Sequence, residues 1–106
     1  MAELAIVYAV FPSAGEAHDC CRNLLQERLV ACANRLAPVI SHYRWEGEIE
    51  TSEEHPVILK TALARQQEVI DRIAQLHRHK VPAILAWPAA AAHPAFALWV
   101  NSETCA

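Results

Sequence analysis

The chain has 106 residues, a length that suits a single domain over residues 1–106. Hydrophobic residues make up 54% of it, more than the roughly 45–50% of an average globular domain. The formal net charge is −3, and lysine and arginine form no run, which argues against a nucleic-acid-binding protein. No apolar stretch approaches the ~20 residues of a membrane span.

The first two elements are predicted to be a strand and a helix. Residues 4–11 form a continuous apolar run, whose length suits a strand buried on both faces. Ser13 and Glu16 have the spacing of a capping box, so we expect a helix to begin near Ala14. Its apolar side chains repeat at helical spacing and are Ala17, Cys20, Cys21, Leu24 and Leu25.

The middle of the chain is predicted to form a long hairpin. Residues 30–36 favour a strand, and residues 39–46 alternate in the way a half-buried strand does. Pro38 between these pieces indicates a bulge or bend in one long strand. Glu46-Gly47 offers a turn, after which residues 48–51 alternate again.

The last third of the chain is predicted to contain two strands and two helices. Pro56 is expected to interrupt the returning strand, so that residues 57–61 form a separate short buried strand. Residues 83–87 read as another apolar strand, and His93 with Pro94 suits the start of a short C-terminal helix. The apolar stripe of the helix before that strand consists of Val69, Ile70, Ile73, Ala74 and Leu76.

This order of elements predicts an α+β fold. Two split βαβ units make a ferredoxin-like βαββαβ sandwich, here with a long hairpin between the second and third strands and a short C-terminal helix. Right-handed crossovers place both main helices on one face of the sheet. Because residues 4–11 are apolar at odd and even positions, we expect a second subunit to cover the other face.

The four cysteines are predicted to be reduced. Cys20 and Cys21 are adjacent and fall on the apolar stripe of a helix, where a free thiol behaves as a small hydrophobe. The first residues also lack the positive region of a signal peptide. Together these observations predict a cytoplasmic protein.

Five short motifs occur in order along nearly the whole chain. They are residues 29–34 (LVACAN), residues 41–47 (SHYRWEG), Lys60-Thr61, Leu76-His77 and Val81-Pro82. In this combination they resemble the CutA family of divalent-cation tolerance proteins. The resemblance implies a ferredoxin-like subunit that assembles into a tight homotrimer through its hairpin and sheet edges. It also implies a role in tolerance to copper and other divalent cations, without established catalysis. The implied architecture also resembles the trimeric nitrogen-regulatory signal proteins of the P-II type.

The chain departs from this family pattern near the positions associated with copper. His77 is the copper-associated position that carries over, whereas Ala9 stands where some members have a cysteine in the first strand. The family usually reads His-Pro-Tyr-acidic before Val-Pro, and residues 77–80 of this chain read His-Arg-His-Lys.

His77 and His79 are the candidate metal ligands. They form a His-x-His pair at a helix end, and two imidazoles with this spacing fit a shared copper, nickel or zinc ion. A stable site takes three or four ligands, so a third would come from another subunit. The alternative is that a charged His77 caps the helix C-terminus and His79 is merely exposed.

Asn34 and Lys60 are candidates for a ligand cleft between subunits. Lysine is unfavourable to bury alone, and Lys60 stands at the end of a buried strand. It would therefore hold an anion in the cleft or pair with Glu46 or Glu48 of the hairpin. Asn34 belongs to the same cleft or anchors the bend before Pro38.

Aromatic residues mark the predicted subunit contacts. Tyr43 and Trp45 share one face of the hairpin, which fits packing between subunits or stacking on a ligand, because aromatic side chains with polar tips are favoured at interfaces. Trp99 is assigned to the subunit interface as well.

Two other protein classes share this order of elements: acylphosphatase-like enzymes and RNA-recognition modules. The loop over residues 11–15 has no arginine for a phosphate cradle, and residues 57–61 carry no aromatic side chain for stacking bases. Cys32 has no general base in the local sequence, so no nucleophile is assigned. We therefore expect a non-enzymatic homotrimer that binds a divalent metal ion or a small ligand.

Overall fold

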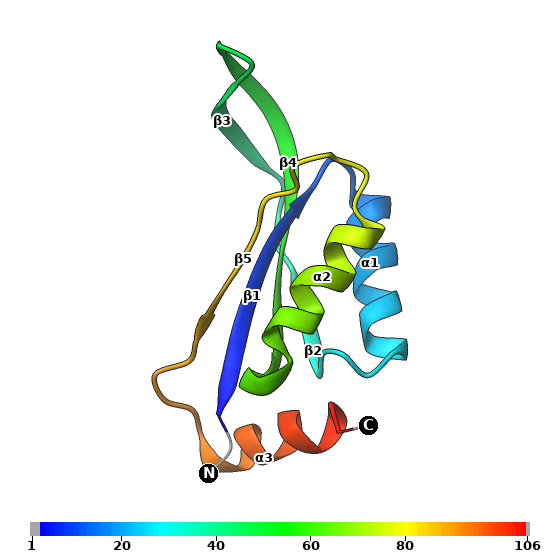
Figure 1. Ribbon diagram of the computed structural model, residues 1–106, viewed down its shortest axis with the longest axis vertical. Helices are drawn as coiled ribbons and strands as arrows, with labels where there is room; N and C mark the ends of the chain where they lie inside the picture. The colour runs from blue at the N-terminus through cyan, green and yellow to red at the C-terminus, as the bar shows by residue number, and fades with distance from the viewer. Residues whose placement is uncertain (1–2, 106) are drawn as a thin grey trace.

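One antiparallel sheet organises the structure, a computed structural model that describes residues 3–105. Its elements are β1 (Leu4–Phe11), α1 (Ala14–Gln26), β2 (Cys32–Arg35), β3 (Val39–Trp45), β4 (Glu48–Ala62), the 3-10 turn η1 (Leu63–Arg65), α2 (Gln66–Leu76), β5 (Ile84–Pro88) and α3 (Pro94–Glu103). The strand order is β2-β4-β1-β5, with β3 paired to β4. Helices α1 and α2 lie on one face and α3 crosses the end of the sheet (Figure 1), so the ferredoxin-like α+β prediction is confirmed.

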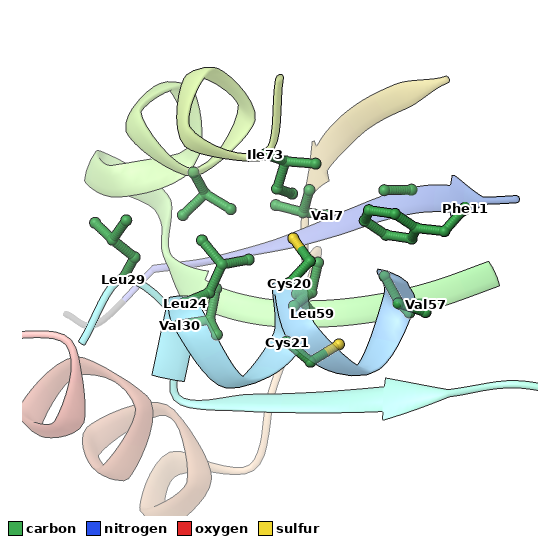
Figure 2. Packing of buried hydrophobic residues seen from close by; sticks show 13 residues of the cluster. Val7, Phe11, Cys20, Cys21, Leu24, Leu29, Val30, Val57, Leu59 and Ile73 are labelled. Atoms are coloured by element: carbon green, nitrogen blue, oxygen red, sulfur yellow. The ribbon is translucent and has the colours of Figure 1, made fainter. Parts of the chain in front are cut away.

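The main core lies between the sheet and helices α1 and α2 (Figure 2). Alternate side chains of β1 and β4 point toward these helices, because successive residues of a strand project to opposite faces. Full burial of one leucine such as Leu24 contributes about 1.5–3 kcal/mol. The core residues are Val7, Ala9, Phe11, Ala17, Cys20, Cys21, Leu24, Leu29, Val30, Val57, Leu59, Val69 and Ile73.

Helix α1 begins as its sequence predicts and ends without a glycine. The hydroxyl of Ser13 accepts the N–H of Glu16 at 3.2 Å and donates to its carboxylate at 2.8 Å. At the other end Arg28 adopts a left-handed φ of 58°, and the N–H of Leu29 donates to the carbonyl of Leu24 at 3.0 Å. This pattern is a Schellman motif, in which glycine is the usual left-handed residue.

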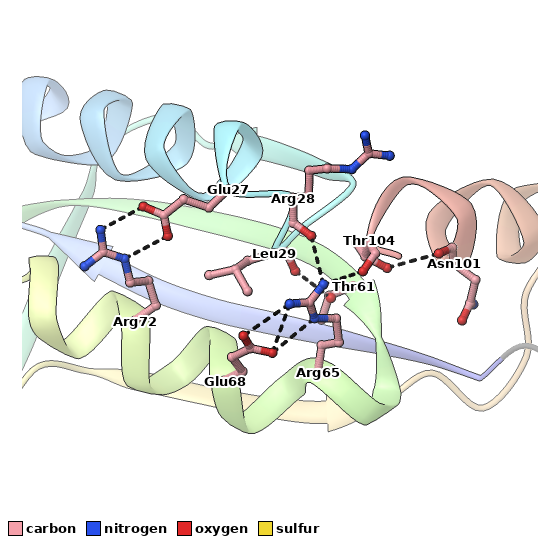
Figure 3. Close-up of polar contacts among 9 residues, drawn as sticks. All are labelled: Glu27, Arg28, Leu29, Thr61, Arg65, Glu68, Arg72, Asn101 and Thr104. Atoms are coloured by element: carbon pink, nitrogen blue, oxygen red, sulfur yellow. Dashed lines mark hydrogen bonds and ion pairs between the residues drawn. The ribbon is translucent and has the colours of Figure 1, made fainter. Parts of the chain in front are cut away.

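Two arginines hold the C-terminal end of α3 against the rest of the domain, and Figure 3 shows the contacts of Arg65. The Arg28 guanidinium donates to the carbonyl of Glu103 at 3.2 Å. Arg65 donates to the carbonyls of Arg28 and Thr104. Cationic donors at a helix C-terminus satisfy its free carbonyls and oppose the negative end of the helix dipole. These bonds offset the left-handed backbone of Arg28 and fix α3 at the end of the sheet.

Strand β4 runs without a break through Pro56, so the prediction of a separate short strand over residues 57–61 was wrong. Pro56 pairs with Val10 in the β1–β4 ladder, and its carbonyl accepts the N–H of Leu36 at 3.0 Å. The nitrogen and carbonyl of one strand residue face the same edge, and at this edge β2 has ended while β3 has not begun. The missing N–H of Pro56 therefore faces the bend around Pro38, at the end of β2, and the ladder with β1 is not interrupted.

The predicted turn at Glu46-Gly47 closes the β3–β4 hairpin. Both residues have positive φ, 49° at Glu46 and 82° at Gly47, as a two-residue type I′ turn requires. Since β4 is continuous, the hairpin projects well beyond the four-stranded part of the sheet (Figure 1), and the molecule measures 46 Å along its longest axis. Among residues 3–105, no helix is long and apolar enough to cross a bilayer.

Replacing Gly47 tests the turn. Gly47→Ala should lower the free energy of unfolding by about 1–2 kcal/mol, because a left-handed φ strains any residue with a β-carbon. The added β-carbon would meet no neighbouring atom within 4 Å, so backbone strain is the only expected cause of the loss. Gly15→Ala in α1 is the matched control, since it also meets no atom within 4 Å and removes a flexible residue from a helix. Urea denaturation of both variants checks the prediction; equal losses would contradict it.

The buried thiol of Cys20 should make stability decrease at alkaline pH. Burial, aided by the neighbouring Cys21, raises the pKa of Cys20 to about 12, whereas an unfolded cysteine ionises near ~8.5. Between these two pKa values only the unfolded chain releases this proton. The free energy of unfolding is therefore highest below the unfolded pKa and decreases as pH rises toward the folded pKa, by at most about 1.4 kcal/mol per pH unit. Urea denaturation between pH 7 and pH 10 should show a steeper decline for the unmodified chain than for Cys20→Ala. An identical pH dependence in both proteins would refute this assignment.

Candidate functional site

The face of the sheet that points away from α1 and α2, here called the open face, has little cover. Residues directly opposite each other in neighbouring strands share a face, so the register identifies its members. Helix α3 covers one end, where Leu4 packs against Ala97 and Val100. The remaining central members of the open face are Ile6, Tyr8, Cys32, Asn34, Ile58, Lys60, Leu85 and Trp87.

Large apolar side chains remain exposed on the open face and along the hairpin. Leu85 is 53% exposed and Trp87 is 42% exposed on β5. The hairpin exposes Ile40 and Ile49, the latter by 71%. By the register, Leu85 and Trp87 belong to the open face, whereas Ile40 and Ile49 lie on the other side of the hairpin. Exposed apolar side chains of this size are typical of surfaces that another molecule covers.

Asn34 and Lys60, predicted separately as cleft residues, lie together on the open face. The ammonium of Lys60 donates to the side-chain carbonyl of Asn34, and Cys32 is directly opposite Lys60 across β2 and β4. The predicted alternative, a pair between Lys60 and Glu46 or Glu48, is wrong within one chain. Lys60 and Glu48 both belong to β4, where twelve steps along the strand place them about 40 Å apart. Glu46 lies in the turn beyond Glu48.

A groove of about 650 Å³ lies between the hairpin and the segment that follows α2. It combines two carboxylates (Glu50 and Glu54), two cationic side chains (Arg44 and Lys80) and the imidazole of His79. Its other lining residues are Val10, Ser41, Tyr43, Trp45, Val81, Pro82 and Ala83. The groove is continuous with the open face, because Val10 of β1 belongs to both.

His77 is a buried structural residue, 8% exposed. Its Nε2 bonds to the carbonyl of Val10 at 2.7 Å, and its Nδ1 bonds to the N–H of His79 at 3.1 Å. The first contact requires an Nε2–H and the second an unprotonated Nδ1, which fixes a neutral tautomer. The ring also stacks on Phe11, with centroids 4.8 Å apart. Both ring nitrogens of His77 are therefore engaged by backbone groups.

His79 is exposed, and its ring centroid lies 5.0 Å from that of His77. The sequence correctly placed the two imidazoles side by side. Over residues 3–105 no group of three or more His, Cys, Asp and Glu side chains is arranged to hold a metal ion. A metal ion bound by this pair would need His77 to release a backbone partner, and the pair remains a prediction.

The aromatic candidates lie on two separate parts of the surface. Tyr43 and Trp45 line the groove, and the Tyr43 hydroxyl lies 3.1 Å from the hydroxyl of Ser52. Trp99 is on α3, 44% exposed, with its ring 5.9 Å from that of Phe96. The groove therefore contains Tyr43 and Trp45 and does not include Trp99.

Cys32 does not have the properties of a catalytic nucleophile. Burial raises the pKa of its thiol, and the nearby Lys60 lowers it by a smaller amount. A thiol with a raised pKa is protonated at neutral pH and reacts slowly. All four cysteines are free thiols, as their distribution in the sequence predicted.

Sequence reasoning missed the groove as a site. No motif in the sequence singled out Glu50 or Glu54, and Lys80 stood out only as a departure from a family motif. Residues 79–83 reach the hairpin only through the tertiary fold, so sequence spacing gave no signal. The one available hint was the strand alternation that places Tyr43 and Glu50 on the same side.

The chain is similar in sequence to known proteins. Residues 5–103 match the family described as CutA1 divalent ion tolerance protein. The divalent-cation tolerance protein CutA of Pyrococcus horikoshii is 39% identical over 101 residues, covering 95% of this chain and 98% of that protein. The protein of the same name from Salmonella newport is 33% identical over 101 residues, covering 95% and 88%.

Solved structures of such proteins have the same fold. The divalent ion tolerance protein CutA1 of Ehrlichia chaffeensis superimposes with a TM-score of 0.94 at 32% identity, covering 100% of this chain and 99% of that one. The protein from Archaeoglobus fulgidus, titled a periplasmic divalent cation tolerance protein CutA, gives a TM-score of 0.92 at 32% identity, covering 95% and 98%. With sequence and fold in agreement over nearly its whole length, this chain belongs to the CutA1 divalent ion tolerance family.

Proposed function

We propose that this protein acts in divalent-cation tolerance as a cytoplasmic homotrimer, binding a metal ion or a small ligand at its subunit contacts and catalysing no reaction. The observation that carries the proposal is the apolar open face, which one copy of the chain leaves in water. Copies of the same chain are the partners with the right chemistry, because most soluble oligomers are closed and symmetric assemblies of one chain.

The hairpin supports self-association through its backbone as well as its side chains. Within the part of the chain that the structure describes, β3 pairs only with β4, and the outer half of β4 pairs only with β3. Unpaired strand edges invite pairing with another chain unless they are protected. A second copy would cover these edges together with the exposed Ile40 and Ile49.

The cytoplasmic location is supported by the thiols. Cys20 and Cys21 are buried and unpaired, as is typical of proteins in a reducing compartment. The net charge of −3 gives no support for nucleic acid as a partner.

The groove supports a role in binding. Its carboxylates and His79 offer oxygen and nitrogen donors of the kind that divalent ions take, and a neighbouring copy would complete the ligand set. His79 is the accessible member of the predicted pair, because both nitrogens of His77 are bonded. The proposed metal positions are His77 and His79, with copper as the first ion to test.

A second candidate function is small-molecule sensing, as in the P-II-type proteins. It is favoured by the size of the groove and by Tyr43 and Trp45 in its wall, since ligand pockets of about 300–1,000 Å³ lined by aromatic residues are common. A small molecule bound there would change the fluorescence of Trp45, and Trp45→Phe would remove that change.

Light scattering after size exclusion tests the assembly. The unmodified chain should give about three times its chain mass of 11.8 kDa at micromolar concentration. Leu85→Glu places a charge on the open face and should shift the mass to one copy, because burying an unpaired carboxylate is strongly unfavourable. Leu25→Glu on α1 is the matched control, an exposed leucine away from the open face, and should keep the trimer. A well-folded monomer of the unmodified chain would refute the proposal.

Calorimetric titration with copper tests the metal site. His79→Ala should weaken copper binding at least tenfold, because it removes the accessible imidazole of the pair. His18→Ala is the control, since His18 is an exposed histidine of α1 that lies outside the groove. Equal affinities in all three proteins, or no binding to any, would exclude this site.

A further inference from the structure

Three polar side chains surround Ile58 at the centre of the open face. Tyr8 lies directly opposite Ile58 in β1, and Asn34 lies directly opposite it in β2. Lys60 is two residues further along β4, so it projects to the same side. The register thus brings a phenol, an amide and an ammonium together from three adjacent strands.

The free polar atoms of this cluster are mainly hydrogen-bond donors. The side-chain carbonyl of Asn34 already accepts a bond from Lys60, which leaves the amide N–H groups of Asn34 and the other N–H groups of Lys60. Within residues 3–105, Lys60 forms no ion pair. The central part of the open face contains no carboxylate. The cluster is therefore cationic and rich in donors, and it lacks a counter-charge.

Apolar side chains enclose the cluster. Ile6 and Ile58 are half-buried neighbours of Lys60, and Leu85 and Trp87 complete the same face on β5. When other copies cover this surface, Lys60 loses its water. An ammonium removed from water is strongly unfavourable unless a negative charge accompanies it.

Symmetry favours a multivalent counter-charge. In a closed rotational assembly whose copies turn the same face inward, equivalent residues lie at equal distances from the axis. The Lys60 side chains of three copies would then form a ring. Oxyanions with several charges and many acceptor oxygens, such as phosphate and polyphosphate, suit a ring of ammonium and amide donors.

We propose that the assembled open faces hold a polyvalent oxyanion, bound by Lys60, Asn34 and Tyr8 of the different copies. This inference rests on the proposed homotrimer. A glutamate from the hairpin of another copy is the competing counter-charge. It is disfavoured because two of the three β4 hairpin carboxylates on the same side, Glu50 and Glu54, share their groove with Arg44 and Lys80 of their own chain.

Thermal unfolding with added anions tests the proposal. Tripolyphosphate at millimolar concentration and constant ionic strength should raise the Tm of the unmodified trimer by several degrees, and calorimetry should give one anion per three chains. Lys60→Met should abolish this rise, because methionine keeps the length of the side chain and removes its charge. Lys60→Arg should retain the rise. Lys80→Met is the control in the groove and should also retain it.

A second variant keeps the test decisive if Lys60→Met does not fold. Asn34→Asp places a fixed carboxylate beside Lys60, so the trimer should remain intact and its Tm should no longer respond to the anion. A trimer that shows no response, or a response that survives both Lys60→Met and Asn34→Asp, would overturn the oxyanion site.

The glutamate alternative has its own signature. If Glu48→Gln, Glu50→Gln and Glu54→Gln together dissociate the trimer while tripolyphosphate has no effect on the unmodified protein, the counter-charge is a hairpin glutamate and the proposal is wrong. Light scattering separates this inference from the proposed function, because a monomer refutes the assembly itself, whereas an intact trimer without an anion response refutes only the oxyanion site.

Discussion

The central constraint on this structure is its sheet, which is apolar on both faces. The two main helices, α1 and α2, cover only one of these faces. Strand β1 sends Val7, Ala9 and Phe11 into the core beneath α1 and α2, while Ile6 and Tyr8 of the same strand project to the opposite side. Helix α3 covers only the end of that side. The cover comes from Ala97 and Val100 against Leu4, and the two arginines hold the C-terminal end of the same helix.

The long hairpin follows from the continuity of β4. Pro56 lies in this strand where its missing N–H meets the bend between β2 and β3, so β4 can pair with β1 on one edge and with β2 and then β3 on the other. The hairpin thereby projects past the core and forms the groove with the segment after α2. The same strand carries Lys60 on the open face and Glu54 in the groove, so a single element connects both candidate sites.

The two histidines show how packing changes the meaning of a motif. A His-x-His pair suggests metal ligation by residue type alone. In the fold, the His77 ring supports the loop after α2 by bonding to Val10 and to the backbone of His79, and only His79 reaches the groove. Membership in the CutA1 divalent ion tolerance family connects the protein with divalent cations, and the geometry directs attention to the groove and the open face.

The sequence by itself determined the class of fold, the family, most elements and the turn at Gly47, because periodicity, capping and left-handed turn residues are local properties of the chain. It also placed His77 beside His79, since only one residue separates them. The tertiary structure alone decided the continuity of β4, the bonding of His77 and the groove, and it brought Asn34 to Lys60. Each of these depends on register between strands distant in sequence, where a shift of one residue would turn every side chain to the other face.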